Sequence, residues 1–416
     1  MRDRQEGRNG AAGSREGAQS QESSVWETLG GLESPPTPSG AASTLVNRMM
    51  VYLRPGQNLD KLHAVLPHVD TGRSGLVLSG ANAGKAMRFL CDIGFDAPVL
   101  MDPACYDDRG KYTATCEAPF QIPDGRIEGS SLEDLLDEQL RMGASAALTP
   151  TGYIPGGGID ILKAAARIAR DLRKEAIFVV PLDASLLARD RFRRTAAVLE
   201  DVARPIALIL GGQFDPLDQS KQIIPNLRSL AATVPLMAIR TDFNAFDLLA
   251  HGAFAGAIGT GGSVRHTVDP AEKPRSYHRR GQEQDQSPSV LVPELACWLR
   301  GSKINSFFGA RPTIVPRCDC RVCRGQRLSR FLRREHQNEA IAHAVAVWSR
   351  WACDMLQAPS MRRRAEYWRN LCQGALDAHT VFLQQMRRMD GLEPQSALKI
   401  WASLPAWPVE LGSAKV

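Results

Sequence analysis

Three cysteines fall within six residues in the last third of the chain, at Cys318, Cys320 and Cys323. Two histidines, His336 and His343, follow on a stretch with helical spacing. Thiolates this close together, with an imidazole about 20 residues further on, are typical ligands of tetrahedral Zn²⁺ in a Cys₃His site. A disulfide or redox role fits less well, because three sulfurs at one point cannot all pair. The spacing therefore predicts a zinc site.

A dense run of basic residues surrounds these cysteines. Between Arg300 and Arg334 the chain carries ten Lys or Arg residues and a single acid, Asp319. A run of like charge is often only a solvated face. A run of basic residues around a metal site, which we call the basic belt, favours contact with a polyanion such as nucleic acid. The arginines that we expect to contact nucleic acid lie closest to the cysteines: Arg317, Arg321, Arg324 and Arg327.

Composition predicts a soluble, cytoplasmic globular protein. The chain of 416 residues is 44% hydrophobic and 23% charged, with a net charge of +6, which is ordinary for a globular protein. It holds no run of 18 apolar residues and no apolar leader, so we expect neither a membrane span nor secretion. Nine cysteines without a secretory signal favour a reducing cytoplasm, where clustered thiols indicate metal before disulfide. Residues 1–44 are poor in apolar side chains and predict a disordered tail.

From Leu45 onward, short apolar runs alternate with stretches of helical spacing. Apolar runs bounded by Gly, Pro or Asp are typical of strands that are buried on both faces. Eight such units predict a parallel (β/α)₈ TIM barrel over residues 45–300, with a doubly wound open sheet as the alternative. We expect a zinc-binding basic subdomain over 301–350 and a helical C-terminal extension over 351–416. The eight expected strands are Met49–Leu53, Gly75–Leu78, Pro98–Met101, Ala146–Leu148, Ala176–Val180, Ile206–Leu210, Leu236–Ile239 and Ala255–Ile258.

Carboxylates follow several of these runs. In a barrel, residues just past the C-terminal ends of the strands line the active-site face. Asp102, Asp183 and Asp242 stand at such positions, and Asp215 comes shortly after its strand. A strand-end aspartate also has an ordinary role as the N-cap of the next helix, and we favour that role for Asp183. Pro103, and no clear helix, follows Asp102, so Asp102 is our first candidate for chemistry.

The cysteine cluster, the expected barrel and the basic belt together resemble the tRNA-guanine transglycosylase (queuine tRNA-ribosyltransferase) superfamily. The segment Cys318-Asp-Cys320-Arg-Val-Cys323 is similar to that family's zinc motif. The resemblance is close over 316–350 and looser over 75–316. It implies a structural Zn²⁺ with His343 as the fourth ligand, because His343 precedes an apolar helical run as the family's histidine does. His336, two helical turns earlier, remains the alternative.

The resemblance also implies an active site at the strand ends. Gly94–Asp102 is similar to the family's strand that ends in a catalytic aspartate, which makes Asp102 an acid/base candidate. Ala257 stands near the position of the family's nucleophilic aspartate, so the nucleophile would come from Asp242 or Asp215. The residues implied to bind the base are Thr151, which replaces the family's base-recognising aspartate, and the loop Gly211, Gly212 and Gln213.

Three functions follow as hypotheses. The first is an enzyme that exchanges a guanine-type base in tRNA or DNA for a 7-deazaguanine-type base through a glycosyl-enzyme intermediate. The second is a non-catalytic zinc- and nucleic-acid-binding relative, such as the partner subunit of an active enzyme in a homo- or heterodimer. The third is an unrelated barrel enzyme that binds a phosphorylated metabolite at the turn Gly259–Ser263.

Overall fold

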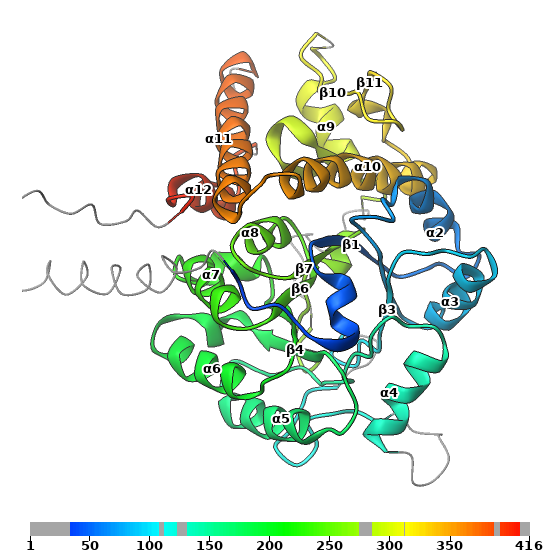
Figure 1. Ribbon diagram of the computed structural model, residues 1–416. Helices are drawn as coiled ribbons and strands as arrows, with labels where there is room; N and C mark the ends of the chain where they lie inside the picture. Colours follow the sequence, from blue (N-terminus) through cyan, green and yellow to red (C-terminus); the bar gives the residue numbers. More distant parts are fainter. Residues whose placement is uncertain are drawn as a thin grey trace, which may run out of the picture.

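The computed structural model describes residues 34–107, 112–122, 131–273, 285–311, 313–386 and 392–407 (Figure 1). Most of the tail expected over 1–44 lies outside these residues, but the 3₁₀ helix η1 (Gly40–Leu45) falls inside them. Ala42 and Leu45 of η1 are buried, so folded structure begins before residue 45. Within the described parts of the chain, no helix combines the length and apolar character that a membrane span requires.

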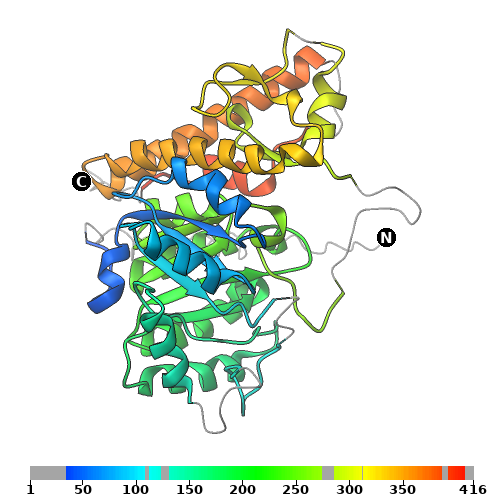
Figure 2. The same ribbon diagram turned by 90° about the vertical axis from the view of Figure 1, so that its right-hand side faces the viewer.

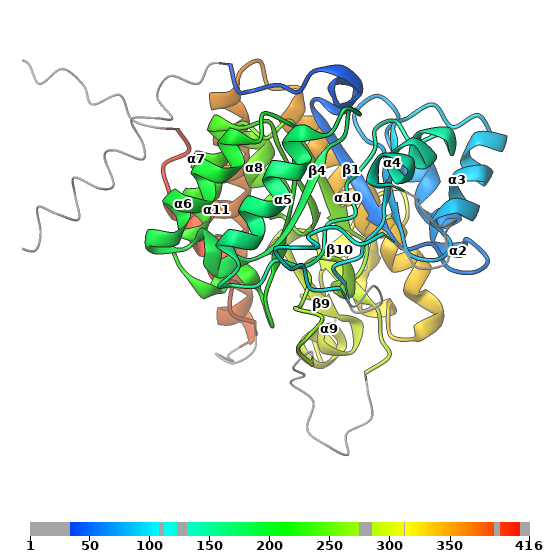
Figure 3. The same ribbon diagram turned by 90° about the horizontal axis from the view of Figure 1, so that it is seen from below.

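A seven-stranded parallel sheet forms the centre of the fold. Its spatial order is β3-β2-β1-β7-β6-β5-β4, so the first and last strands in sequence, β1 and β7, pair with each other. The sheet curls into a half-barrel with helices on its outer side (Figures 1 and 3). The strands are β1 (Arg48–Leu53), β2 (Leu76–Ser79), β3 (Val99–Asp102), β4 (Phe178–Asp183), β5 (Ile206–Gly211), β6 (Leu236–Thr241) and β7 (Ala255–Gly259).

Seven of the eight expected strands are therefore present as strands. The eighth, expected at Ala146–Leu148, runs between the two edge strands of the curled sheet. On one side the Ser145 backbone N–H donates to the carbonyl of Val99 in β3 at 2.8 Å. On the other side Leu148 forms a parallel bridge with Ile177, next to β4. This segment thus holds the two edges of the half-barrel near each other.

The strands are mainly apolar, with polar residues chiefly at their ends, because both of their faces are buried. In β1, Met50 and Tyr52 belong to the apolar cluster on the concave face, whereas Met49, Val51 and Leu53 pack under the outer helices. The other strands alternate in the same way, with Ile209 inside and Leu208 outside in β5. Double burial removes the polar alternation that a half-exposed strand shows, which is why short apolar runs were a sound signal here.

Amphipathic helices cover the outer face. In α5 the buried residues Leu162, Ala165, Ala166 and Ala169 follow the i, i+3, i+4, i+7 spacing of one helix face. Seen from below, α3 and α4 lie on one flank of the sheet and α6 and α7 on the other (Figure 3). The covering helices are α2 (Asp60–Val65), α3 (Ala83–Asp92), α4 (Leu132–Arg141), α5 (Ile159–Asp171), α6 (Arg189–Asp201), α7 (Ile223–Thr233) and α8 (Asn244–Ala250).

A second layer of C-terminal elements lies across one side of the sheet (Figure 2). Its helices are fixed by aromatic side chains, since Trp348 and Trp368 are buried and Trp368 stacks on Phe246 of α8 at 5.2 Å. The elements are β8 (Ser289–Val292), β9 (Cys297–Arg300), α9 (Gly301–Phe308), β10 (Arg317–Cys318), β11 (Gln326–Arg327), α10 (Gln337–Leu356), α11 (Met361–Met386) and α12 (Ser396–Ser403).

Short 3₁₀ turns complete the described part of the chain. Besides η1, they are η2 (Leu66–His68), η3 (Ala184–Leu187), η4 (Pro216–Gln219), η5 (Gly262–Val264), η6 (Pro293–Leu295), η7 (Leu328–Arg330) and η8 (Arg334–His336).

Candidate metal centre and strand-end carboxylates

The three cysteines and His343 meet at one point. The ligand atoms of Cys318, Cys320, Cys323 and His343 all lie within 4.8 Å of one another. The His343 Nδ1 atom is 3.4 Å from the Cys320 Sγ and 3.3 Å from the Cys323 Sγ. A tetrahedral ion with bonds of 2.0–2.3 Å separates its ligand atoms by roughly 3.5 Å, so the spacing is that of a metal ligand set.

The second nitrogen of His343 fixes the orientation of its ring. Nε2 lies 2.8 Å from the backbone carbonyl of Leu291 in β8, an acceptor, so Nε2 carries the hydrogen and donates it. Nδ1 is then left with its lone pair toward the sulfurs, as a metal-bound imidazole requires. His336 does not join the cluster: its Nδ1 instead accepts from the Arg333 backbone N–H at 3.3 Å. Between the two histidines considered, the structure selects His343.

A tight turn brings the cysteines together. The Gly325 backbone N–H donates to the Cys318 carbonyl at 2.9 Å, and the Arg324 N–H donates to the Cys320 carbonyl at 2.9 Å. Gly325 adopts φ +81°, a left-handed conformation that favours glycine. The short strands β10 and β11 flank this turn. We call residues 317–327 the knuckle.

The four arginines expected to contact nucleic acid are all exposed on this knuckle: Arg317, Arg321, Arg324 and Arg327. Arg330, another member of the basic run, is instead used internally, since its guanidinium pairs with Glu339 at 2.5 Å and contacts the Cys323 sulfur. A groove of about 1060 Å³ lies beside the knuckle, with Arg317 and Arg321 on one wall. Arg350 of α10 also lines it, as do Asp70 and Asp354, so its charge is mixed.

Asp102 is buried at the C-terminal end of β3, with 3% of its surface exposed. Two phenols donate to its Oδ2 atom, Tyr52 at 2.7 Å and Tyr106 at 2.5 Å. The Ala104 backbone N–H donates to Oδ1 at 2.8 Å. Burial raises the pKa of Tyr52, and the Asp102 charge raises it further, so this phenol stays protonated and keeps donating. Asp102 is thus a fixed carboxylate on the concave face.

An arginine of β6 completes this group. The Arg240 guanidinium lies 5.2 Å from the centre of the Tyr106 ring and donates to Asp107 at 3.3 Å. Asp107 also pairs with Arg54, which follows β1. Arg240 reaches this face because it has φ +51° and lies where the register of β6 and β7 shifts; such irregularities re-aim side chains at strand ends. We call Asp102, Tyr52, Tyr106 and Arg240 the Asp102 group.

The residues expected to bind a base are near the strand ends but already have partners. The Thr151 hydroxyl is 2.8 Å from that of Thr149, which in turn accepts from the Val179 backbone N–H. A Cβ added at Gly211 would overlap the Tyr153 ring, so that ring fills the space above this glycine. The Gly212 N–H donates to the Thr267 carbonyl at 2.9 Å, and the Gln213 amide contacts Glu272.

The second pair of candidate carboxylates lies apart from the Asp102 group. Asp215 and Asp242 line a cavity of about 190 Å³ at the C-terminal ends of β5 and β6, together with Arg265 and Trp298. Burial raises the pKa of Asp215 to about 7, with a further contribution from the Asp242 charge. Burial also raises the pKa of Asp242. We call this space the β5/β6 cavity. Asp102 is not among the residues that line this cavity.

Asp183 caps η3, as expected. Its Oδ1 atom accepts from the Ser185 backbone N–H at 2.9 Å, and Tyr153 donates to its Oδ2 at 3.2 Å. Ala257, at the position compared with the family's nucleophile, is buried in β7 on the concave face. No residue of β7 carries a carboxylate.

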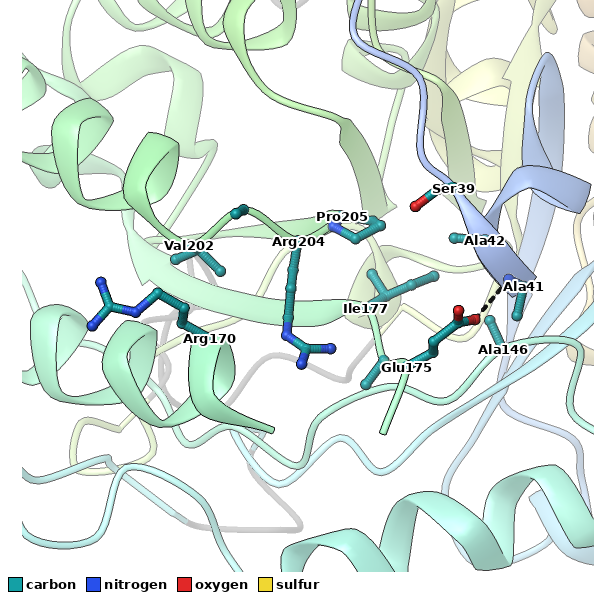
Figure 4. A pocket seen from close by; sticks show the side chains of 12 residues that line it. Ser39, Ala41, Ala42, Ala146, Arg170, Glu175, Ile177, Val202, Arg204 and Pro205 are labelled. Atoms are coloured by element: carbon teal, nitrogen blue, oxygen red, sulfur yellow. Dashed lines mark hydrogen bonds between the residues drawn. The ribbon is translucent and has the colours of Figure 1, made fainter. Parts of the chain in front are cut away.

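A further cavity, of about 210 Å³, opens at the opposite end of the strands (Figure 4). Its charged side chains already have structural partners. Glu175 accepts from the Ala41 backbone N–H at 3.1 Å and so holds η1, while Arg204 donates to the Lys174 carbonyl at 2.8 Å. Arg170 pairs with Asp201 at 2.6 Å. These groups stabilise the N-terminal end of the sheet.

The residues that sequence reasoning missed are Tyr52, Arg54, Asp107, Arg265 and Trp298. Tyr52 stands inside an apolar run, where a tyrosine hydroxyl needs a partner once it is buried, and that was the available signal. For Arg240 the signal was its place at the C-terminal end of an expected strand, where barrel residues line the active-site face.

No protein-family model matches the chain, and no curated protein sequence matches it. Among solved structures, it is similar to a protein described as a deoxyribose-phosphate aldolase from Coccidioides immitis, with 14% identity and a TM-score of 0.30 over 58% of this chain and 92% of that one. It is also similar to a protein described as a mandelate racemase/muconate lactonizing enzyme from Sorangium cellulosum, with 16% identity and a TM-score of 0.30. That alignment covers 59% of this chain and 56% of the other. Neither likeness bears on function.

Proposed function

We propose that this chain is a base-exchanging transglycosylase that acts on tRNA or DNA and replaces a guanine-type base with a 7-deazaguanine-type base. The observation that carries the proposal is Asp102, a carboxylate fixed by Tyr52 and Tyr106 at the C-terminal end of β3. The exposed arginines of the knuckle support it, because a polyanionic substrate needs cations that are accessible from solution.

The proposal includes a closed (β/α)₈ barrel and a structural zinc ion. The segment from Ser145 to Leu148 supports the barrel, since it bonds to both edges of the seven-stranded sheet. Cys318, Cys320, Cys323 and His343 would hold the zinc. Four protein ligands leave no open coordination position, so the ion stabilises the knuckle and takes no part in the exchange. We further propose a cytoplasmic protein that works as a homo- or heterodimer.

Within this proposal Asp102 attacks the sugar, in place of the acid/base role that the resemblance implied for it and of the attack that it implied for Asp242 or Asp215. A carboxylate oxygen of Asp102 bonds to the anomeric carbon as the bond from that carbon to the base breaks, and the departing base keeps the bonding electrons and takes up a proton from water. The incoming base then gives a proton to water, bonds to the same carbon and releases Asp102 with the electrons of the carbon–oxygen bond. Tyr52 and Tyr106 orient the carboxylate, and the nearby Arg240 guanidinium offsets charge on the leaving base.

Substitution of Asp102 with asparagine is expected to reduce base exchange by at least about 10³-fold, because an amide is a far poorer nucleophile. The measurement is incorporation of radiolabelled guanine into bulk tRNA and into DNA by the purified full chain. Asp96→Asn is the matched control, since Asp96 is an exposed residue just before β3. Full exchange by Asp102→Asn would remove Asp102 from the chemistry.

A non-catalytic nucleic-acid-binding relative is the second candidate. One observation favours it: β7 offers no carboxylate where the resembled family has its nucleophile. This candidate predicts that the wild-type chain on its own binds nucleic acid but incorporates no label. The Asp102→Asn variant is expected to behave in the same way. It also predicts that label appears once a catalytic partner subunit is added.

Both candidates require the knuckle arginines to bind phosphates. We expect that replacing Arg317, Arg321, Arg324 and Arg327 together with glutamine lowers the slope of log affinity against log salt by about 3 to 4, because each neutralised phosphate contributes roughly 0.9 to that slope. Fluorescence anisotropy with labelled tRNA between 50 and 200 mM salt measures this slope. The control is Arg193→Gln with Arg194→Gln on α6, which lies far from the knuckle (Figure 1). An unchanged slope would remove the knuckle from the interface.

A further inference from the structure

The β5/β6 cavity has no role in the proposed base exchange, yet its polar groups converge. Asp215 and Asp242 enter from the ends of two neighbouring strands. Arg265 comes from the segment after β7, and Trp298 from β9 closes the space, with the Arg265 guanidinium 3.2 Å from its ring centre. Four elements distant in sequence therefore line one small cavity.

Each of these side chains has hydrogen-bonding capacity that its neighbours do not use. Asp215 accepts from the Leu217 backbone N–H through Oδ1, and Asp242 accepts from the Asn244 N–H through its own Oδ1, which leaves Oδ2 of each for the cavity. On the donor side, the Nη2 atom of Arg265 and the Nε1 atom of Trp298 are buried without a hydrogen-bond partner among the described residues. Buried polar atoms are rarely left unpaired.

Both the acidic and the basic side chains of the cavity are buried with little opposite charge beside them. Burial and the neighbouring charge of Asp242 together raise the pKa of Asp215 to about 7, so a cation beside this carboxyl would favour its ionised form. Burial lowers the pKa of Arg265 to about 9, and the attraction of Asp242 does not offset that burial. Arg265 forms no ion pair within 4.0 Å in the described part of the chain.

A ligand that pairs with the two carboxyls and with Arg265 must carry both a positive and a negative group. The carboxyl pair calls for a cation, and a guanidinium beside an indole N–H calls for a carboxylate, its favoured partner. A cavity of about 190 Å³ leaves room for one small molecule, so both groups must belong to the same ligand. The rest of the lining combines an apolar side, formed by Leu210, Pro216 and Leu217, with the polar residues Thr241, His266 and Gln395.

We propose that the β5/β6 cavity binds a free α-amino acid with an apolar side chain. The ammonium group lies between Asp215 and Asp242, and the carboxylate accepts from Arg265 and Trp298. The side chain packs against Leu210 and Leu217. This site is independent of base exchange and of the Asp102 group.

Calorimetric titration of the full chain with L-leucine and L-valine tests the site. We expect one molecule bound per chain. Two analogues dissect the charges: 4-methylpentanoate lacks the amine and leucinamide lacks the carboxylate. Each is expected to bind at least about 10-fold more weakly than L-leucine, the loss that a missing charge-assisted hydrogen bond causes.

Matched variants assign the binding to these residues. Asp242→Asn and Trp298→Phe are each expected to weaken L-leucine binding at least about 10-fold, and circular dichroism checks that each variant is folded. Asp183→Asn is the control, because Asp183 is also a capping strand-end aspartate but lies outside the cavity. Affinity should also rise between pH 6 and pH 8, since the ammonium displaces the proton held by the carboxyl pair; Asp218, Arg265 and His266 face this pair.

Three results would overturn the proposal. The first is no measurable binding of either amino acid. The second is equal binding of L-leucine, leucinamide and 4-methylpentanoate, which would indicate apolar contact alone. The third is binding of guanine that Asp242→Asn abolishes, which would assign the cavity to the base instead.

Discussion

A chain in which serine replaces Cys323 is expected to bind no zinc and to unfold at lower denaturant than the wild type. Cys323 is fully buried, and its sulfur lies 3.3 Å from the His343 Nδ1 atom. Serine offers a poorer ligand for a soft ion, and three ligands do not hold a structural zinc in place. Because metal binding supplies folding free energy to small metal-bound units, we expect a loss of at least about 3 kcal/mol.

Elemental analysis of purified protein measures the metal, and urea unfolding measures the stability. Wild type should contain about one zinc per chain, and treatment with a chelator should reproduce the instability of Cys323→Ser. Cys353→Ser is the control, since Cys353 is a half-buried cysteine of α10 outside the cluster. A stable, zinc-free wild type would contradict the assignment of the four residues as a zinc site.

Removal of Asp247 is expected to destabilise the fold by about 3–5 kcal/mol, the cost of leaving a buried charge without its partner. Arg228 of α7 and Asp247 of α8 are each no more than 1% exposed. The Arg228 guanidinium donates to both carboxylate oxygens, with Nη2 2.6 Å from Oδ1 and Nε 3.0 Å from Oδ2. Alanine at 247 leaves this guanidinium buried and without its carboxylate.

The same variant should loosen the C-terminal segment. Arg228 Nη1 donates to the Pro405 carbonyl at 3.3 Å, and the ring of His251, which contacts Asp247, reaches the Ala406 carbonyl at 3.1 Å. Urea unfolding gives the free energy, and limited proteolysis reports on the segment. Asp201→Ala is the control, because its pair with Arg170 is largely exposed and should cost no more than about 1 kcal/mol. An equal loss of unfolding free energy in the two variants would show that burial of the Arg228–Asp247 pair does not increase its contribution to stability.

The parts of the fold that local sequence determines were predictable. The strands appeared as apolar runs because both faces of the sheet are buried, and the knuckle appeared because its three sulfurs are close in sequence. The resemblance favoured His343 over His336, and the structure bears this out because the Nδ1 atom of His343 lies 3.4 Å from the Cys320 sulfur and 3.3 Å from the Cys323 sulfur.

The groups assembled by the curl of the sheet were not predictable in the same way. Tyr52 and Asp102 lie 50 residues apart and meet because β1 and β3 flank β2. Asp215 and Asp242 were separate candidates in sequence, and nothing local indicated that they share a cavity with Arg265. For the segment Ala146–Leu148 the sequence predicted more regular structure than forms. Its apolar run was recognised, but it joins its neighbours by too few hydrogen bonds to form a regular strand.

The position of η1 matters for anyone who attaches a probe to this protein. Because η1 precedes β1, and its Ala41 is held by Glu175 just before β4, the chain enters the folded region at the N-terminal end of the strands. The Asp102 group and the β5/β6 cavity both lie at the other end. A fluorophore or affinity handle attached within η1 therefore lies on the side of the fold away from both sites.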